Sequence, residues 1–589
     1  MTSRITIDGG KVLEFSPGPT LLEILREGGV KTEAPCGGKG ICGKCRVSLK
    51  GDGGPVTDEE KAFLSSEDIA EGVRLSCLCR PVGDVAVSLS DQEEKGSAIL
   101  TDGNRPDFEI CPAIGSVPIS IPRPEIRDGM SLLDHLESVA GPLKPDASLV
   151  RRIPQAFRSK EVTAVFHKDS LIDLIPERDP ELYGLAVDVG TTTVVVSLIS
   201  LKTGETVGSA SEINPQKDFG LDVISRIERC ETFPTGLEDL HDAIISCLDR
   251  LVDKVCSDKG TSRKRIYEMA IGSNATMTSL LLGVHPWSLG RAPFSPVLRR
   301  GMTVPSVDLG VELAPGARAY VLPGVSAYIG SDIVAGMVAT ELMEDRGIRL
   351  FIDIGTNGEI VLSDRGRLSA CSCAAGPALE GMNISCGMRA SDGAVESVRL
   401  NESFAELGVI GGGTPRGLCG SAILDVLSEV VRLEMVGKTG RLKPGPMIAE
   451  ENGKRALVLR ERDPRLTVTQ GDLRQVQLAR GAILSGFISL LEANDLTMAD
   501  IDQVLVAGQF GRHLSVDSLT GSGLIPMELK ERITYCGNTS GAGAAMCLLS
   551  RKARDDAERL SDMVDYVELS VLESYDRLFS RCLQFEVSR

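Results

Sequence analysis

The chain has 589 residues, of which 42% are hydrophobic and 25% charged, so it carries enough apolar material for several packed domains. Its formal net charge of −18 argues against a nucleic-acid partner, because a phosphate backbone is bound by clustered Lys and Arg. The N-terminus lacks a basic segment followed by an apolar one, and no apolar run approaches the roughly 20 residues that cross a bilayer. We therefore expect a cytoplasmic protein without a membrane partner, whose 16 Cys are reduced, with some of them serving metal or redox chemistry.

Residues 1–92 are expected to form the first domain. A strand at Ile5–Ile7, a tight turn, a return strand at Val12–Phe15 and a helix at Leu21–Arg26 precede a loop rich in Cys and Gly. Three thiolates in that loop and a fourth far along the chain suit a [2Fe–2S] cluster, in which each iron takes two Cys sulfurs. The predicted ligands are Cys36, Cys42, Cys45 and Cys77.

Several alternatives apply to this loop. Zinc is the main rival, although zinc usually gathers its ligands as two close pairs, and Cys79 competes with Cys77 as the fourth ligand. Residues 38–43 satisfy G-x-G-x-x-G and residues 38–44 resemble a P-loop, but no strand precedes and no helix follows them as those motifs require. The spacing of the Cys resembles plant-type and adrenodoxin-type ferredoxins, and this resemblance implies a β-grasp fold.

Two further segments precede the main body. Residues 93–124 are rich in Asp, Glu, Gly and Pro and are predicted to be a linker, whose root-mean-square span would be near 30 Å for about 30 flexible residues. Residues 125–180 are predicted to form a small middle domain, with a helix in Met130–Gly141 and a strand at Val162–Phe166. Nothing in the sequence assigns a role to this domain.

An apolar strand, a turn and a second apolar strand follow within Gly184–Gly204. The turn presents the hydroxyls and backbone N–H groups of consecutive Thr to an anion, and a carboxylate lies beside it for a divalent cation. Taken alone, such a turn is equally well explained as a mere hairpin. The residues of this first phosphate turn are Asp188, Gly190, Thr191, Thr192 and Thr193.

The same pattern occurs again within Leu350–Leu362, LFIDIGTNGEIVL. Two copies in one long region predict a duplicated α/β unit, whose two turns face each other across a cleft and hold the phosphates of one nucleotide. The residues of this second phosphate turn are Asp353, Gly355, Thr356 and Asn357.

The two turns resemble the phosphate motifs of the actin, sugar kinase and heat-shock-70 ATPases. The strand within Val504–Leu514, which ends at Gly508, resembles that superfamily's adenosine motif, and Leu322–Ala335 and Asn538–Cys547 fit its connecting helices. The resemblance implies that residues 181–589 form a duplicated ribonuclease-H-like body that binds ATP and Mg²⁺. An unrelated α/β fold with Gly-rich turns is the alternative.

The roles of the nucleotide-site residues follow from this resemblance. Asp188 and Asp353 would act through metal-bound water, and Gly508 would approach the adenosine. No residue is identified as the base that orients the attacking water. Slow hydrolysis is therefore expected.

The whole chain, with a ferredoxin-like domain, linker, middle domain and ATPase body, resembles the reductive activators of corrinoid proteins, including the activating enzymes of O-demethylase systems. This resemblance implies an α/β multidomain enzyme that uses ATP and a low-potential electron donor protein to reduce the inactive Co(II) form of a corrinoid protein to Co(I), in support of a methyltransferase system. It also implies a homodimer. Asn383–Arg389, NISCGMR, is the candidate contact for the corrinoid. Some activators carry further [4Fe–4S] motifs at the C-terminus, whereas this chain has only Cys582 near its end.

Three other functions stay open. The first is a small-molecule kinase with a regulatory ferredoxin domain. The second is an ATP-driven activator of another low-potential enzyme, such as a 2-hydroxyacyl-CoA dehydratase, although those activators hold a [4Fe–4S] cluster between subunits. The third is a module that binds nucleotide without hydrolysing it.

Overall fold

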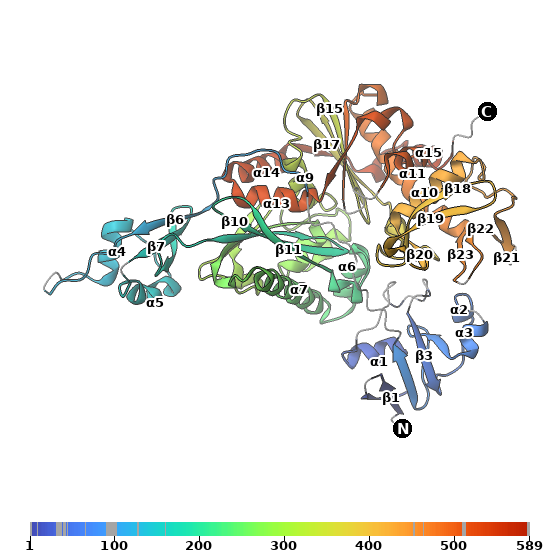
Figure 1. Ribbon diagram of the computed structural model, residues 1–589, viewed down its shortest axis with the longest axis horizontal. Helices are drawn as coiled ribbons and strands as arrows, with labels where there is room; N and C mark the ends of the chain where they lie inside the picture. Colours follow the sequence, from blue (N-terminus) through green and yellow to red (C-terminus); the bar gives the residue numbers. More distant parts are fainter. Residues whose placement is uncertain are drawn as a thin grey trace. The chain divides into compact units, whose positions relative to one another are not determined.

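The computed structural model of the protein describes every residue except 1, 2, 9, 31–37, 39, 41, 42, 44, 65, 90–102, 127, 128, 160, 452, 453, 463, 509–513 and 586–589. The chain divides into two compact units (Figure 1). The first unit contains residues 1–96 and 214–244, and the second contains residues 97–213 and 245–589.

A five-stranded mixed sheet forms the N-terminal domain. In spatial order its strands are β2 (Lys11–Phe15), β1 (Ser3–Ile7), β5 (Val85–Leu89), β3 (Arg46–Gly51) and β4 (Val73–Leu75). Helix α1 (Leu21–Glu27) begins with a capping box between Thr20 and Glu23 and turns its buried Leu and Ile residues into the domain core. A hairpin, a helix and a parallel pairing of the first and last strands make a β-grasp, which confirms the predicted fold of this domain.

Short helices complete the first unit. They are α2 (Asp58–Lys61), α3 (Ser66–Ala70), η1 (Pro215–Asp218), α6 (Val223–Thr232) and the first turns of α7 (Gly236–Lys259).

The first half of the second unit contains a six-stranded sheet. In spatial order its strands are β11 (Thr206–Ile213), β10 (Thr193–Ser200), β9 (Tyr183–Val189), β12 (Ile266–Ser273), β14 (Arg318–Val321) and β13 (Met302–Pro305). The strands β9, β10 and β11 form an antiparallel meander, while β12 lies parallel to β9 and β14 lies parallel to β12. The first phosphate turn is the connection from β9 to β10.

The second half repeats this arrangement. In spatial order its strands are β25 (Ile533–Gly537), β24 (Gln503–Ala507), β15 (Ile348–Ile354), β16 (Gly358–Asp364), β17 (Arg367–Cys373) and β26 (Val564–Tyr566). The strands β15, β16 and β17 again form a meander, and β24 and β25 again follow in parallel. Five strands share one order and one set of directions in the two halves, which confirms the duplicated actin and sugar-kinase-like fold. The sixth strand differs, because β13 pairs with β14 whereas β26 pairs with β17. The second phosphate turn connects β15 to β16.

Two helices from opposite halves cross with their backbones in close contact. They are α9 (Ser331–Ala339) and α13 (Thr539–Leu549), which lie within the two predicted connecting segments. A Cβ atom at Gly543 would lie 2.0 Å from the carbonyl oxygen of Ala335. Only glycine therefore permits this approach.

A long helix, α11 (Gln470–Ala493), fills the core of the second half. It is long and apolar enough to cross a membrane, but 72% of its apolar window is buried inside the protein. Val476, Ile483 and Phe487 belong to the largest apolar cluster of this half. The helix is a core element, as its apolar stripe predicts.

This half has further helices and sheets. They are α10 (Gly420–Arg432), α12 (Val516–Gly521), α14 (Arg551–Met563), α15 (Tyr575–Cys582), and two three-stranded sheets, β19 (Ala405–Val409), β18 (Ala394–Leu400), β20 (Gly417–Leu418), and β21 (Ile448–Glu451), β22 (Lys454–Arg460), β23 (Leu466–Thr469). Of these, α14 packs against α9 and α13.

The predicted linker at 93–124 extends too far along the chain, because its second part contains a strand of the small middle domain. Residues 90–102 lie outside the described residues, but β6 (Ile114–Ile119) pairs along its whole length with β7 (Val162–His167). Cys111 donates its N–H to Leu549 at 2.8 Å and accepts from the N–H of Arg551 at 3.0 Å. Only Ile114 of β6 is buried, so this strand leaves no alternating pattern in the sequence.

The strands β6, β7 and β8 (Ser170–Ile175) form a small sheet that packs with α4 (Leu132–Ala140) and α5 (Ala147–Ala156). Two neighbouring residues of β12 hold this small unit. The Tyr267 hydroxyl donates to Asp173 at 2.6 Å, and Glu268 lies 3.5 Å from His167 Nε2. These buried polar contacts fix the small unit to the first half of the body.

Candidate iron-sulfur and nucleotide sites

The thiols of Cys45 and Cys77 lie 3.2 Å apart. Cys45 immediately precedes β3, and Cys77 follows β4, which is the antiparallel neighbour of β3. Both side chains are buried, at 3% and 6% exposure. Two thiols at this separation suit a single iron of a [2Fe–2S] cluster. The other two predicted ligands, Cys36 and Cys42, lie outside the described residues.

Cys79 has a different environment. Its thiol lies 3.3 Å from the carbonyl oxygen of Gly53 and packs in the apolar core with Ile5 and Leu21. Burial raises the pKa of Cys79 to about 11, so the thiol stays protonated. Because metals bind the thiolate, this geometry favours Cys77 over Cys79 as the fourth ligand.

Glycines in the cysteine loop are required by packing. Gly40 and Gly43 have φ values of +71° and +64°, and a Cβ atom at either would lie within 3 Å of Leu78 or Phe63. This requirement explains the accidental G-x-G-x-x-G match without a nucleotide.

A buried ion pair, which the sequence did not reveal, supports the ligand at Cys77. Glu60 and Arg74 are 0% and 6% exposed, and their charged groups lie 2.8 Å apart. Glu60 also accepts the N–H of Leu75, two residues before Cys77. Burial opposes the ionisation of Glu60, but hydrogen bonds from Arg74 and two backbone N–H groups outweigh it and lower the pKa.

The first phosphate turn meets the N-terminus of α13. Asp188, at the end of β9, accepts hydrogen bonds from Asn538 Nδ2 at 2.9 Å and from Ser540 Oγ at 2.7 Å. Burial raises the pKa of Asp188, and these two hydrogen bonds partly offset the rise. The segment 538–547 was predicted to be a connecting helix, but its polar contacts with Asp188 were not foreseen.

The turn itself is closed by its own backbone and by the next strand. Gly190 donates its N–H to the carbonyl oxygen of Thr193 at 2.9 Å, where a Cβ atom would also lie 2.9 Å away. Asn274, immediately after β12, donates from Nδ2 to Thr191 Oγ1 at 2.9 Å. Three strands of the first half therefore contribute to one end of the site.

Two carboxylates have raised pKa values: Asp353 of the second phosphate turn, and Asp332 in the first turn of α9. Burial is the main cause, and the pKa of Asp353 and of Asp332 rises to about 7 in each case. Repulsion from Asp332 and Asp188 adds to the rise at Asp353, whereas a hydrogen bond from the N–H of Ile333 partly offsets the rise at Asp332. Gly355 donates its N–H to Asn357 O at 3.0 Å, which closes the turn. Gly508 has φ +97°, and a Cβ atom there would lie 2.7 Å from Asp353 Oδ1. The end of the predicted adenosine strand therefore lies against the second turn, while residues 509–513 lie outside the described residues.

One carboxylate joins the two turns. Glu380 accepts a hydrogen bond from Thr192 Oγ1 at 2.8 Å and another from Thr356 Oγ1 at 2.6 Å. Glu380 is only 7% exposed and ends the short helix η5 (Pro377–Glu380). Nothing in the segment Cys373–Gly381, which contains Glu380, predicts this role. The structure thus confirms that the two turns face each other.

The chemistry of this cluster fits a hydrated divalent cation with nucleotide phosphates. Five carboxyl groups around the turns have raised pKa values, mainly because of burial, and a cation would favour their ionised forms: Asp188, Asp332, Asp353, Glu359 and Glu380. Within the described part of the chain, no three Asp, Glu, His or Cys side chains are close enough to hold an ion by themselves. Mg²⁺ retains several waters and takes phosphate oxygens, so it suits such a site.

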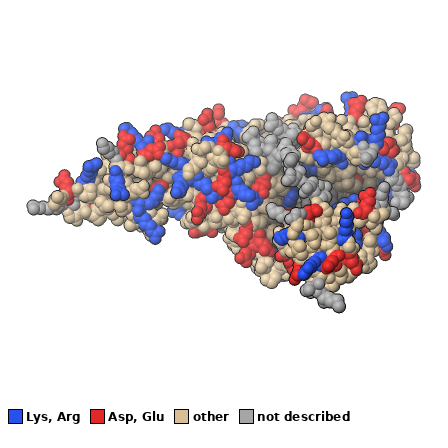
Figure 2. All heavy atoms as spheres, turned by 60° about the horizontal axis from the view of Figure 1, so that its bottom comes forward, with Lys and Arg blue, Asp and Glu red and all other residues tan. Residues whose placement is uncertain are grey.

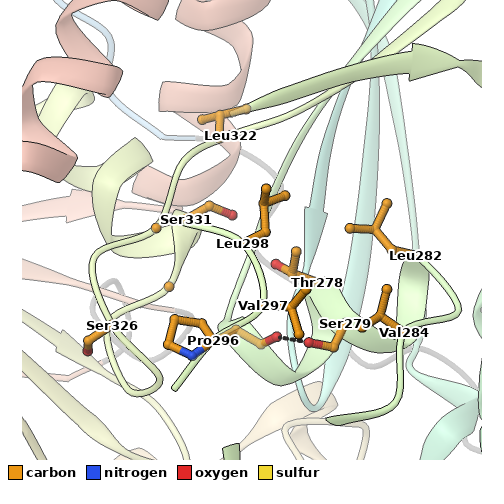
Figure 3. Close-up of a pocket in the computed structure, with 13 residues that line it drawn as sticks. Thr278, Ser279, Leu282, Val284, Pro296, Val297, Leu298, Leu322, Ser326 and Ser331 are labelled. Atoms are coloured by element: carbon orange, nitrogen blue, oxygen red, sulfur yellow. Dashed lines mark hydrogen bonds between the residues drawn. The ribbon is translucent and has the colours of Figure 1, made fainter. Parts of the chain in front are cut away.

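A separate small cavity adjoins the first half of the site (Figure 3). It measures about 30 Å³ and is lined by α8 (Ala275–Leu281), the loop at Pro296–Leu298 and the start of α9. In Figure 3 the Thr278 and Ser279 side chains project from α8, and Ser279 donates to Ala275 O at 3.0 Å. This volume holds about two water molecules and no nucleotide.

Figure 2 shows Lys and Arg side chains interspersed with Asp and Glu on the face in view.

Models of known protein families match three parts of the chain. The 2Fe-2S iron-sulfur cluster binding domain matches residues 5–82, the RACo middle region matches residues 183–345, and the C-terminal domain of RACo, its ASKHA domain, matches residues 347–588. The family's middle region therefore corresponds to the first half of the duplicated body and not to the small unit at 125–180.

A solved structure named reductive activator for corrinoid,iron-sulfur protein is 31% identical to this chain, covers 99% of it and 98% of its own length, and has a TM-score of 0.73. The chain belongs to the family of corrinoid reductive activators. Two further members of this family are similar over most of their length. The corrinoid activation enzyme RamQ of Eubacterium limosum is 28% identical over 92% of both chains. The [Co(II) methylated amine-specific corrinoid protein] reductase of Methanosarcina barkeri is 23% identical over 68% of this chain and 76% of its own.

Proposed function

We propose that this protein is an ATP-dependent reductive activator, which returns the inactive Co(II) form of a corrinoid protein to Co(I) by one-electron transfer. The full-length similarity to a reductive activator carries the proposal, because it includes the cluster domain and the nucleotide site in one chain. The printed names of the relatives from E. limosum and M. barkeri support a corrinoid protein as the substrate.

In this proposal four thiolates hold a [2Fe–2S] cluster, which supplies one-electron transfer when bound. The ligands are Cys36, Cys42, Cys45 and Cys77. The protein buries two of these thiols in the core and holds the strand that leads to Cys77 through the Glu60–Arg74 pair. Burial limits access of water to the ligands.

The two phosphate turns would hold a Mg²⁺–ATP complex. The hydroxyls of Thr191, Thr192 and Thr356 would donate hydrogen bonds to phosphate oxygens, while Asp188 and Asp353 would orient water on the cation. Gly190, Thr193, Gly355 and Asn357 shape the turns, and Gly508 lets adenosine approach the second turn. These assignments rest on the closeness of the two turns through Glu380.

A physical reason links the two sites. A plant-type cluster has a potential near about −400 mV, and each 59 mV uphill costs about 1.4 kcal/mol for one electron. Nucleotide binding can shift a conformational equilibrium by several kcal/mol if one state is bound better, which is enough to bias the transfer. A low-potential donor protein would reload the cluster, and the family resemblance implies a homodimer.

The deciding experiment is anaerobic optical spectroscopy of a Co(II) corrinoid protein mixed with this protein and a low-potential reductant, with and without Mg-ATP. We expect the Co(I) band to appear rapidly only with Mg-ATP. A Co(I) yield that does not depend on ATP, with the cluster intact and several corrinoid proteins tested, would overturn the proposal. It would favour a kinase or an activator of another low-potential enzyme.

A further inference from the structure

We propose that Glu380 is an internal competitor of the nucleotide phosphates, and that its displacement by nucleotide is passed to the surface loop 381–389. The inference rests on the nucleotide binding proposed above. It assigns Glu380 a positioning role for the same site.

Glu380 and a phosphate would compete because each Thr hydroxyl has a single proton to donate. In the structure Thr192 and Thr356 both donate to Glu380, at 2.8 and 2.6 Å. A phosphate that takes these donors must first release them from the carboxylate. Glu380 therefore lies where the two turns would otherwise present their hydroxyls to an anion.

Charge makes the competition stronger. Glu380 is 7% exposed, and burial raises its pKa, while the two Thr hydroxyls and the positive charge of Arg389 act in the opposite direction. An ionised carboxylate in such a place repels phosphate with little screening by solvent. Nucleotide binding is therefore opposed both by lost hydrogen bonds and by repulsion until Glu380 moves.

The chain after Glu380 is arranged to move with it. Gly381 has φ +76°, and a Cβ atom at Gly387 would lie 1.9 Å from Gly381 O, so the loop closes tightly on the residue next to Glu380. The far end of the loop is attached to β20, because Met388 donates its N–H to Leu418 O and Leu418 donates its N–H to Cys386 O.

Between these two ends the loop reaches solvent. Asn383 and Ser385 are exposed, and only Ser385 of the two is attached to a helix, through its N–H and hydroxyl on Asp472. A loop tied to Glu380 at one end and exposed at its middle can present the nucleotide state to a docking partner. This loop contains the Asn383–Arg389 segment named above as the candidate corrinoid contact.

The first arm of the test measures binding of Mg-AMPPNP by isothermal titration calorimetry. Wild type should bind, and E380Q should bind about tenfold more tightly, because the amide fills the same space without the charge. The matched control is E396Q, since Glu396 is an exposed glutamate on β18 and its loss changes the net charge equally. Wild type that does not bind would overturn the proposed nucleotide function itself. Wild type that binds, with E380Q equal or weaker, would overturn only the role of Glu380.

The second arm measures hydrogen exchange of peptides covering 381–389. In wild type, Mg-AMPPNP should speed exchange there by about threefold or more. E380A without nucleotide should already exchange at that faster rate, and nucleotide should change it little. A nucleotide-dependent change of wild-type size in E380A, at saturating Mg-AMPPNP, would show that the loop does not respond through Glu380. The same hydrogen-exchange measurement on T192V and T192S, without nucleotide, tests the contact while Glu380 stays unchanged. T192V loses the hydroxyl that donates to Glu380 and should exchange faster at 381–389, whereas T192S keeps the hydroxyl and should exchange as the wild type does.

Discussion

The Ser540 hydroxyl donates a 2.7 Å hydrogen bond to Asp188, although the two residues are 352 positions apart in the chain. The contact joins α13, in the second half of the body, to the first phosphate turn in the first half. It also explains why the first turn alone does not make a site, since the partners of its carboxylate come from the other end of the chain.

Removal of that hydroxyl should weaken nucleotide binding. In S540A, Asp188 loses one of the two hydrogen bonds that favour its ionised form, so its pKa should rise further. A hydrogen bond to a charged group contributes about 1.5–3 kcal/mol, so we expect Mg-ATP to bind at least about tenfold more weakly. Calorimetry checks this value. S570A is the matched control, because Ser570 makes a 2.7 Å hydrogen bond to Glu568 at an exposed position. Equal losses in the two variants would contradict the assignment.

Substitution of the two neighbouring cysteines should separate ligand from core residue. C77S should lose the cluster, and with it the visible absorption and bound iron, whereas C79S should keep both because its hydroxyl can still donate to Gly53 O. Iron content and the optical spectrum after anaerobic purification measure the difference. A bleached C79S with an intact C77S would reverse the assignment. Nucleotide binding should be unchanged in both variants.

Mg²⁺ binding should strengthen as pH rises. The pKa of Asp332 and of Asp353 is about 7, so both are largely protonated at pH 5 and ionised at about pH 8. A cation needs the ionised forms, so affinity should rise up to tenfold per pH unit for each proton released, and level off above about pH 7. Calorimetry in buffers of different ionisation enthalpy counts these protons. An affinity independent of pH between about 5 and 8 would show that these groups do not face the cation.

The same two groups set the sign of a stability effect. Their folded pKa values exceed the unfolded value of 3.8, so between about pH 4 and 7 the folded chain binds more protons. Their contribution is fully present below the unfolded pKa and is lost as pH rises through about 7. The Tm of the metal-free protein should therefore fall as pH rises from about 4 to 7. Mg²⁺ should raise the Tm by a larger amount at pH 8 than at pH 6.

A single added methyl group where α9 and α13 cross should lower the free energy of unfolding. In G543A the new Cβ would lie 2.0 Å from Ala335 O, and overpacking of this kind costs about 1–3 kcal/mol or more. G471A is the control, since Gly471 also lies in a helix but its nearest neighbour would be Thr469 Oγ1 at 3.5 Å. Alanine there should be neutral or stabilise by up to about 1 kcal/mol. Urea unfolding of both variants tests the contrast.

The sequence predicted those parts of the site that are local. Each phosphate turn is a strand, a short turn and a strand, and its β-branched residues, Gly and Asp occur within 15 residues or so. The cysteine loop is equally local, and so are the long helix at 470–493 and the single predicted strand of the small unit, Val162–Phe166. Local periodicity and turn chemistry therefore sufficed for the duplicated fold.

The rest of the site depends on topology. Asp332, Asn538 and Ser540 lie inside segments that were predicted to be connecting helices, and Glu380 lies just before the candidate corrinoid contact. Nothing in these segments shows that the first three residues lie near Asp188 or that Glu380 lies between the two Thr. The β6 strand was not predicted, for another reason. It is an edge strand with one buried residue, so its sequence lacks the alternation of apolar and polar residues that indicates a strand. The Glu60–Arg74 pair likewise joins the helix α2 to the strand β4, which are adjacent only after folding.

The attachment of the small unit at Tyr267 and Glu268 makes it a lever arm. The contact lies near the start of β12, while Asn274, which holds Thr191, lies just past its end, about 23 Å away at about 3.3 Å per residue. Displacement grows with distance from an axis of rotation, so a few degrees of turning near the phosphate turns moves α4 further than it moves Asn274. A fluorophore at the exposed Val139 of α4 would therefore amplify a rotation that is too small to detect within the cleft.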